Sequence, residues 1–192
     1  MRALVVYESL FGNTHTVAEA VASGMAQARP DLDVRCLPVA KVAGAADTAL
    51  GDVDLLVVGC PTHALGMSSV RSRAGQLAKD RAQDPERRHD PDAAGPGVRE
   101  LMAVLPRRTS SLRAAAFDTR LASWFSGGAA GRIARGLRRA GAVVVGRPTG
   151  FIVEGMAGPL ADGELERARA WGGELAAVLA ADRPAGSELT GG

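Results

Sequence analysis

Short apolar segments alternate with helical segments about five times along this chain of 192 residues, and this alternation constrains the fold more than any other feature. The apolar segments are rich in β-branched residues and are apolar on both sides, as in strands with both faces buried. The segments between them place small and apolar residues at helical spacing. Such an alternation predicts an α/β fold in which helices cover both faces of a parallel, doubly wound sheet.

The pattern predicts a five-stranded sheet whose final strand is interrupted. The strands are expected over residues 2–7, 33–37, 54–60 and 113–118, and over 142–145 with 151–154 as the two halves of the last one. The main helices are expected over residues 13–29, 69–82, 98–105, 128–140 and 162–181. Segment 83–97, rich in Pro and Gly, is typical of an exposed loop. We expect one domain over residues 1–182 and a disordered tail over 183–192.

The composition is that of a soluble globular protein, with 46% hydrophobic and 23% charged residues. No apolar segment is long enough to span a bilayer, and the start lacks a secretory signal, so we expect a cytoplasmic protein. The net charge is only +2, and seven aromatic residues are too few for a base-stacking surface, which disfavours nucleic-acid binding. Cys36 and Cys60 are expected to be reduced thiols, on strands that a third strand separates.

The segment Ser-Leu-Phe-Gly-Asn-Thr, residues 9–14, ends the first strand and opens the first helix. Free amides at a helix start bind a phosphate group, and a glycine lets the backbone approach the ligand. One glycine, where a dinucleotide fingerprint has three, indicates a mononucleotide. The segment has no Lys or Arg, so backbone amides and side-chain donors must hold the phosphate; the donors are Ser9, Asn13, Thr14 and Thr16. The alternative is a plain turn in which Ser9 or Asn13 caps the helix.

Two further loops follow strands at the same expected edge of the sheet, where ligands bind in such folds. In the loop over residues 61–68, Leu65 and Met67 flank a glycine and would suit a planar heterocycle. His63 is either a proton carrier or a ring packed against loop carbonyls. In the loop after Asp118, the adjacent aromatics Trp124 and Phe125 either stack on a ligand or cover the core.

Together the three loops resemble those of the flavodoxin-like family of FMN-binding proteins. The family's phosphate loop has the form Ser/Thr-x-Thr-Gly-x-Thr, whereas this chain has Phe11 in place of the central hydroxyl residue. The second loop resembles the one that packs along the flavin ring, and the third matches in position and aromatic content. The resemblance covers about residues 1–181. It implies a sheet of order 2-1-3-4-5.

By this resemblance the cofactor is FMN, and the partner is a redox protein or a small electron acceptor. The residues implied in FMN binding are Ser9, Leu10, Phe11, Gly12, Asn13, Thr14, Thr16, Pro61, Thr62, His63, Ala64, Leu65, Gly66, Met67, Asp118, Thr119, Arg120 and Trp124. Family members carry single electrons or reduce quinones, the flavin supplying the chemistry. Three functions stay open: an electron carrier, an FMN-dependent NAD(P)H:quinone oxidoreductase, and a flavin-free binding module.

Charge separates this chain from the acidic electron-carrying members of the family. It is slightly basic, and we expect Arg71, Arg73 and Arg120 near the pocket. Positive charge there favours an anionic reduced flavin, which predicts a hydroquinone couple less negative than in acidic flavodoxins. An acidic face for a basic reductase is missing from the sequence. We also expect the flexible Gly66 peptide to lie beside flavin N5.

Overall fold

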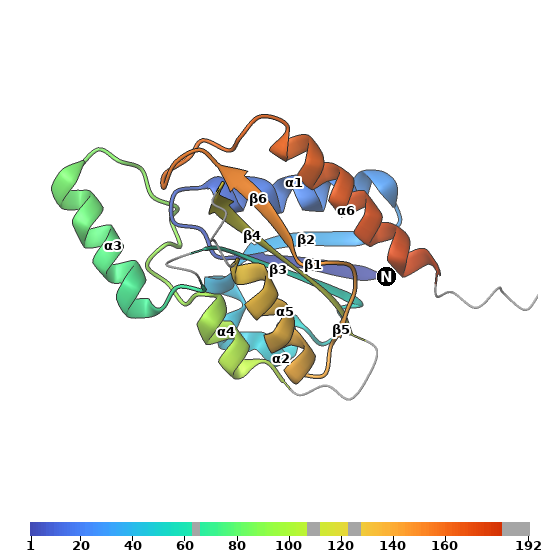
Figure 1. Ribbon diagram of the computed structural model, residues 1–192. Coiled ribbons are helices and arrows are strands. Elements are labelled where there is room, and N and C mark those ends of the chain that lie inside the picture. The colour runs from blue at the N-terminus through green and yellow to red at the C-terminus, as the bar shows by residue number, and fades with distance from the viewer. Residues whose placement is uncertain (63–65, 107–111, 123–127, 182–192) are drawn as a thin grey trace, which may run out of the picture.

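The computed structural model describes residues 1–62, 66–106, 112–122 and 128–181. Six parallel strands form one sheet in the order β2-β1-β3-β4-β5 (Figure 1). The sixth strand, β6, pairs with the later part of β4, whereas β5 pairs with its start. The strands are β1 (Arg2–Tyr7), β2 (Asp33–Pro38), β3 (Leu55–Pro61), β4 (Arg113–Leu121), β5 (Val143–Val144) and β6 (Thr149–Val153). The helices are α1 (Asn13–Ala28), α2 (Ala46–Ala49), α3 (Val70–Gln83), α4 (Val98–Val104), α5 (Ala129–Arg139) and α6 (Glu164–Ala181).

The final strand is interrupted, as the sequence predicts. β5 pairs with the start of β4 through Arg113 and Val143, and β6 pairs with its later part from Phe117 and Thr149 onward. Both pairings are parallel, so the two pieces continue one strand direction along the same neighbour. The order of the remaining strands is also the predicted one, and β1 lies between the strands that carry the free thiols of Cys36 and Cys60.

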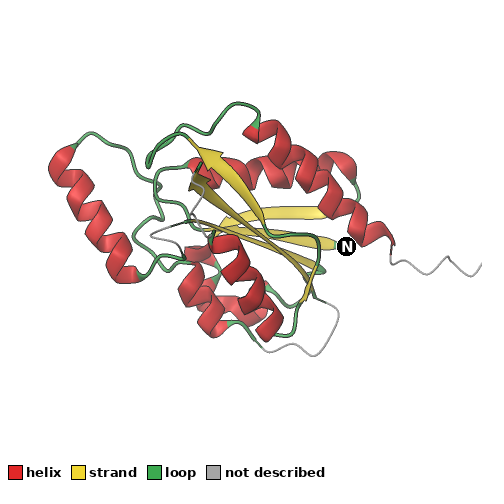
Figure 2. Ribbon diagram, in the orientation of Figure 1, coloured by secondary structure: helices red, strands yellow, loops and turns green. Residues whose placement is uncertain are grey.

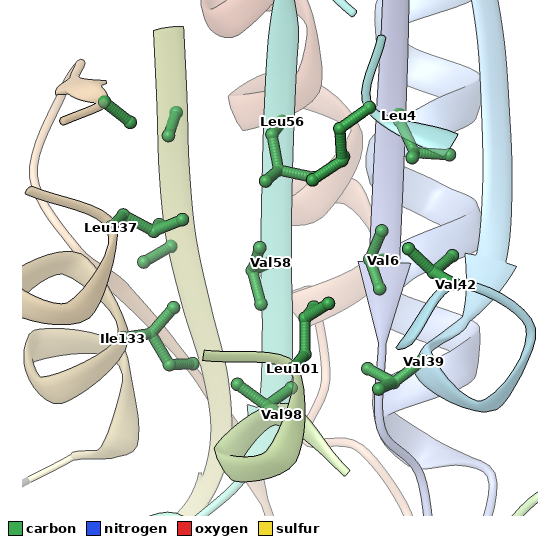
Figure 3. Packing of buried hydrophobic residues seen from close by; sticks show 14 of the residues in the cluster. Leu4, Val6, Val39, Val42, Leu56, Val58, Val98, Leu101, Ile133 and Leu137 are labelled. Atoms are coloured by element: carbon green, nitrogen blue, oxygen red, sulfur yellow. The ribbon is translucent and has the colours of Figure 1, made fainter. Parts of the chain in front are cut away.

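Helices cover both faces of the sheet (Figure 2). Alternate residues of the central strands point to opposite faces, so β1 and β3 supply apolar side chains to two cores. In one core, Leu4 and Leu56 of the sheet belong to the same buried cluster as Leu101 of α4 and Ile133 of α5 (Figure 3). The second core lies under α1 and α6, where Val5 and other strand residues meet a set that includes Trp171. Burial of both sheet faces explains why the strand sequences are apolar without alternation.

Helices α1 and α6 pack closely at their crossing because glycine stands on each of them. A Cβ atom at Gly24 would lie 2.0 Å from the carbonyl oxygen of Arg169, and one at Gly172 would lie 2.2 Å from the carbonyl oxygen of Val21. Neither position has room for a methyl group without separating the helices.

The segment after α3 is less exposed than the sequence suggests. Residues 84–97 form a loop, but Asp90 and Ala93 within it are buried. The Asp90 amide donates to the carbonyl of Leu10 at 2.9 Å, and Ala93 packs with Leu10 and Leu77. The segment is thus a loop that is exposed over most of its length, as predicted, but Asp90 and Ala93 anchor it behind residues 9–14. Helix α3 itself lies apart from the sheet (Figure 1).

Candidate functional site

The carboxyl ends of β1, β3 and β4 meet at one edge of the sheet, as parallel strands require. A cavity of about 240 Å³ opens there. Its lining comes from four loops or strand ends and comprises Ser9, Leu10, Phe11, Asn13, Thr14, Pro61, Thr62, Thr119, Arg120, Leu121, Val153 and Met156. Most of the lining consists of residues that the sequence singles out. The structure therefore brings the first loop and the starts of the second and third loops together around one space.

Backbone amides at the start of α1 are free to bind an anion. Gly12 precedes the helix with a positive φ of 90°, and no side chain caps the helix. The Gly12 amide donates to the Ser9 hydroxyl oxygen at 3.0 Å. The next three amides, those of residues 13–15, donate to no acceptor in the described part of the chain. A helix start that lacks a capping side chain and opens on a cavity is suited to a phosphate group, so the plain capped turn is not what forms here.

Two contacts fix the first loop to its neighbours. The hydroxyl groups of Thr14 and Thr119, both buried, lie 2.7 Å apart and join the start of α1 to the end of β4. The Asn13 amide group lies against Gly158, where a Cβ atom would be only 2.5 Å from Asn13 Oδ1. Thr16 does not line the cavity, and its exposed hydroxyl donates to the Gly12 carbonyl at 3.0 Å.

Asp118 holds the start of α5 and does not line the cavity. This fully buried carboxylate accepts hydrogen bonds from the Ala130 amide at 2.9 Å and from the Thr62 hydroxyl at 3.1 Å. The Ala129 amide in turn donates to Thr62 Oγ1 at 3.0 Å. Burial raises the pKa of Asp118, while the Ala130 amide and then the Arg120 guanidinium act in the opposite direction. The contribution of Asp118 is therefore to position the second loop against α5.

Arg120 is the cation that lines the cavity among the described residues, and its side chain is 31% exposed. Its Nε lies 3.7 Å from Asp118 Oδ1, so the carboxylate partly balances its charge. The prediction that Arg71 and Arg73 lie with Arg120 near the cavity is not supported. Arg71 is exposed on α3, and Arg73 is buried in a separate cluster of charged groups.

That cluster lies behind the first and second loops and could not be read from the sequence. Arg73 donates to the Ser68 hydroxyl at 2.8 Å and to Glu100 Oε2 at 2.7 Å, and lies 3.7 Å from Glu8 Oε1. Ser68 also donates to Glu8, which accepts the Val98 amide at 2.8 Å through its other oxygen. The cluster therefore joins the residue before the first loop, the end of the second loop and the start of α4.

Only part of the second loop reaches the cavity. Pro61 and Thr62 line it, whereas Gly66 and Met67 do not. A Cβ atom at Gly66 would lie 2.9 Å from a terminal nitrogen of Arg132 on α5, and Arg99 donates to the Met67 carbonyl at 2.7 Å. The remaining residues of these loops that the sequence singles out lie outside the described residues; they are His63, Ala64, Leu65, Trp124 and Phe125.

The β6–α6 connection forms a wall of the cavity that was not predicted. Val153 ends β6, and Met156, which is 64% exposed, follows it at the cavity. The signal was available, because Gly155 and Gly158 follow the last strand at the same edge as the other loops. Leu121 at the end of β4 also lines the cavity; it belongs to the third predicted loop but not to the residues implied in FMN binding.

The loop over residues 84–97 supports the first loop from outside. His15 on α1 stacks on the Tyr7 ring at a centroid distance of 4.5 Å, and its Nδ1 lies 3.2 Å from Asp90 Oδ2. Burial and then the nearby Asp90 carboxylate raise the pKa of Tyr7. The His89 ring packs near the Phe11 ring, with the two ring centroids 5.6 Å apart. This loop thus orders the residues behind the cavity without entering it.

Solved structures with the same arrangement include flavodoxins. An archaeal flavodoxin matches with a TM-score of 0.61 and 22% identity over 94% of this chain and 99% of its own. Flavodoxin 2 from Bacillus cereus matches with a TM-score of 0.62 and 15% identity over 94% and 99%. The fold is that of a flavodoxin. A Streptococcus pneumonia flavodoxin agrees with this flavodoxin-like fold, with a TM-score of 0.61 and 18% identity over 93% and 99%.

The likeness is one of structure. No protein-family model and no curated protein sequence matches the chain. At identities of 15–22% to these flavodoxins, the shared feature is the fold, and the residues at the cavity must carry any functional argument. No helix among the described residues is both long and apolar enough to cross a membrane.

Proposed function

We propose that this protein binds FMN in the cavity at the carboxyl edge of the sheet and that the bound FMN transfers electrons. The observation that carries the proposal is the start of α1, where three amides beside the Ser9 hydroxyl find no acceptor among the residues that the structure describes. When bound, FMN accepts and donates electrons at its ring system. The chain's own part is to bind the phosphate, place the ring and admit a redox partner protein or a small acceptor.

The residues present fit a flavin mononucleotide. Nothing lies within 4 Å of the position of a Cβ atom on Gly12, so its backbone is open to a ligand. The free amides and the positive end of the α1 dipole stabilise the negative charge of a phosphate group. This explains how the first loop can bind a phosphate although it contains no Lys or Arg. Apolar groups of Leu10, Leu121 and Val153 line the rest of the cavity, as a planar ring requires. Phe11, in place of the family's hydroxyl residue, removes one phosphate donor.

Titration with FMN and with riboflavin tests the proposal, because the two ligands share the ring and differ in the phosphate. We expect FMN fluorescence to be quenched on binding and riboflavin to bind at least about tenfold more weakly. Asn13→Asp adds a carboxylate at the phosphate end of the cavity and should weaken FMN binding while sparing riboflavin. Gln27→Glu, an exposed position late in α1, is the control with the same charge change.

The outcome separates the three functions considered. Absence of FMN binding would refute the proposal and leave a flavin-free binding module. Equal affinity for FMN and riboflavin would refute the phosphate site. FMN binding together with steady-state NADPH oxidation in the presence of a quinone would identify an oxidoreductase. FMN binding without such turnover supports an electron carrier. A cytoplasmic location stays a prediction from the sequence, which fractionation of the source cells would test.

A further inference from the structure

Arginines gather on the outer face of α5. Residues 119–153 contain six arginines and no aspartate or glutamate. The helix turns Ile133 and Leu137 toward the sheet, and its exposed positions include Arg132, Arg135, Arg138 and Arg139. No ion pair joins these four to any part of the chain that the structure describes. Because the whole chain has a net charge of only +2, this positive face is a local feature.

The arginine face borders a groove of about 630 Å³ between α4 and α5. Arg132, Arg135 and Arg139 line it from α5, while Met102 and Leu105 supply an apolar part of its lining. None of the described lining residues is acidic. Arginine and methionine are enriched in the buried centres of protein interfaces, and charged groups around an apolar patch orient a partner of opposite charge.

The groove lies beside the second loop. Met67 lines it, and the Arg132 guanidinium packs against Gly66. A molecule seated in the groove therefore contacts the loop whose first residues, Pro61 and Thr62, line the cavity. This adjacency places a partner in the groove beside a loop that also reaches the ligand cavity.

We propose that the groove between α4 and α5 docks the acidic face of a redox partner protein, with Arg135 and Arg139 contacting its carboxylates. This inference rests on the proposed function, since the partner exchanges electrons with the FMN. A protein fits better than a nucleic acid or a membrane. The described lining has no aromatic residue for base stacking, and a flat bilayer surface does not fill a concave groove.

Electron-transfer rates measured against salt concentration test the proposal. One probe is a reduced acidic [2Fe–2S] ferredoxin, mixed with the protein that holds oxidised FMN. The other is an oxidised basic c-type cytochrome, mixed with the protein whose FMN has first been reduced. Both reactions are followed in a stopped-flow instrument from about 20 to about 300 mM salt. We expect the rate constant with the ferredoxin to fall as salt rises and that with the cytochrome to rise. Such opposite slopes report the charge at the docking surface, which the small net charge alone would not produce.

Charge reversal at the groove supplies the decisive variant. Arg135→Glu/Arg139→Glu should lower the low-salt rate with the ferredoxin at least about tenfold and flatten its salt dependence. Arg35→Glu/Lys79→Glu makes the same change in formal charge at exposed positions on β2 and α3 and should leave the rate within about twofold. Equal effects of the two double variants would overturn the proposal.

Two further measurements keep the inference separate from the proposed function. FMN retention and circular dichroism are recorded first for every variant; because Arg135 and Arg139 are exposed, both are expected to match the parent protein. If FMN does not bind at all, the proposed function fails, and docking is tested by calorimetric binding of the ferredoxin to the flavin-free protein. Tighter binding of duplex DNA or phosphatidylserine vesicles, lost in the same groove variant, would overturn docking of a protein.

Discussion

Removing the buried guanidinium of Arg73 tests how the loops around the cavity are held. Arg73 is 1% exposed and contacts Glu8, Ser68 and Glu100. In Arg73→Met the side chain keeps much of its volume but loses its charge and donors, so Glu8, which is 7% exposed, keeps a buried carboxylate without its cation. Breaking a buried ion pair from one side costs about 3–5 kcal/mol. Because the Val98 amide and Ser68 still donate to Glu8, we expect the lower value, about 3 kcal/mol.

Urea unfolding followed by far-ultraviolet circular dichroism measures this loss. With a slope of about 2 kcal/mol per M urea, the midpoint should fall by roughly 1.5 M. In Glu8→Gln/Arg73→Met a neutral amide replaces the carboxylate, so most of the lost stability should return. Arg71→Met, an exposed position on the same helix, should change stability by less than about 0.5 kcal/mol. A loss below about 1 kcal/mol in the single variant, or no recovery in the double variant, would refute this reasoning.

Three other predictions concern helix packing, a buried acid and the flavin potential. Gly24→Ala places a methyl group against the Arg169 carbonyl and should cost about 2–3 kcal/mol in thermal unfolding, whereas Gly44→Ala, which meets nothing within 4 Å, should not. Burial raises the folded-state pKa of Asp118 above its unfolded value, so its contribution to stability falls as pH rises from the unfolded toward the folded pKa. Asp118→Asn should therefore gain stability relative to the parent over that pH interval in urea titrations, and a constant difference would count against the raised pKa. Arg120→Gln removes the cation at the cavity and should make the hydroquinone couple of bound FMN more negative by roughly 40 mV, corresponding to about 1 kcal/mol, in a redox titration. An unchanged potential would contradict that role.

Local pattern explains what could be predicted of the fold. The buried strands β1 and β3 consist largely of β-branched and aliphatic residues. Such continuous apolar runs are typical of strands that are buried on both faces of a sheet, so they could be recognised in the sequence. The break before Pro148 predicted the division of the last strand into β5 and β6. Once helices alternate with parallel strands, the carboxyl edge is the place where ligands bind, which is why residues 9–14 could be assigned to the site.

Contacts between distant segments explain what could not be predicted. Arg73 follows the second loop closely in the sequence, so it was expected near the cavity. In the folded chain it instead contacts Glu8 and Glu100, which come from two other segments. Arg120, and not Arg73, lines the cavity. Segment 84–97 has the composition of an exposed loop, yet Asp90 within it is held behind the first loop by the Leu10 carbonyl.

The amino-acid sequence by itself determined the layered sheet and the turn at Gly12 that opens a helix at its edge, because apolar periodicity and turn residues are local properties of the chain. The structure decided that no side chain caps this helix. Only the tertiary structure decided which charges face the cavity, which are neutralised in the core and which remain on the surface of α5. Those outcomes depend on pairs such as Thr14 with Thr119, 105 residues apart, whose side chains meet only after the strands have assembled.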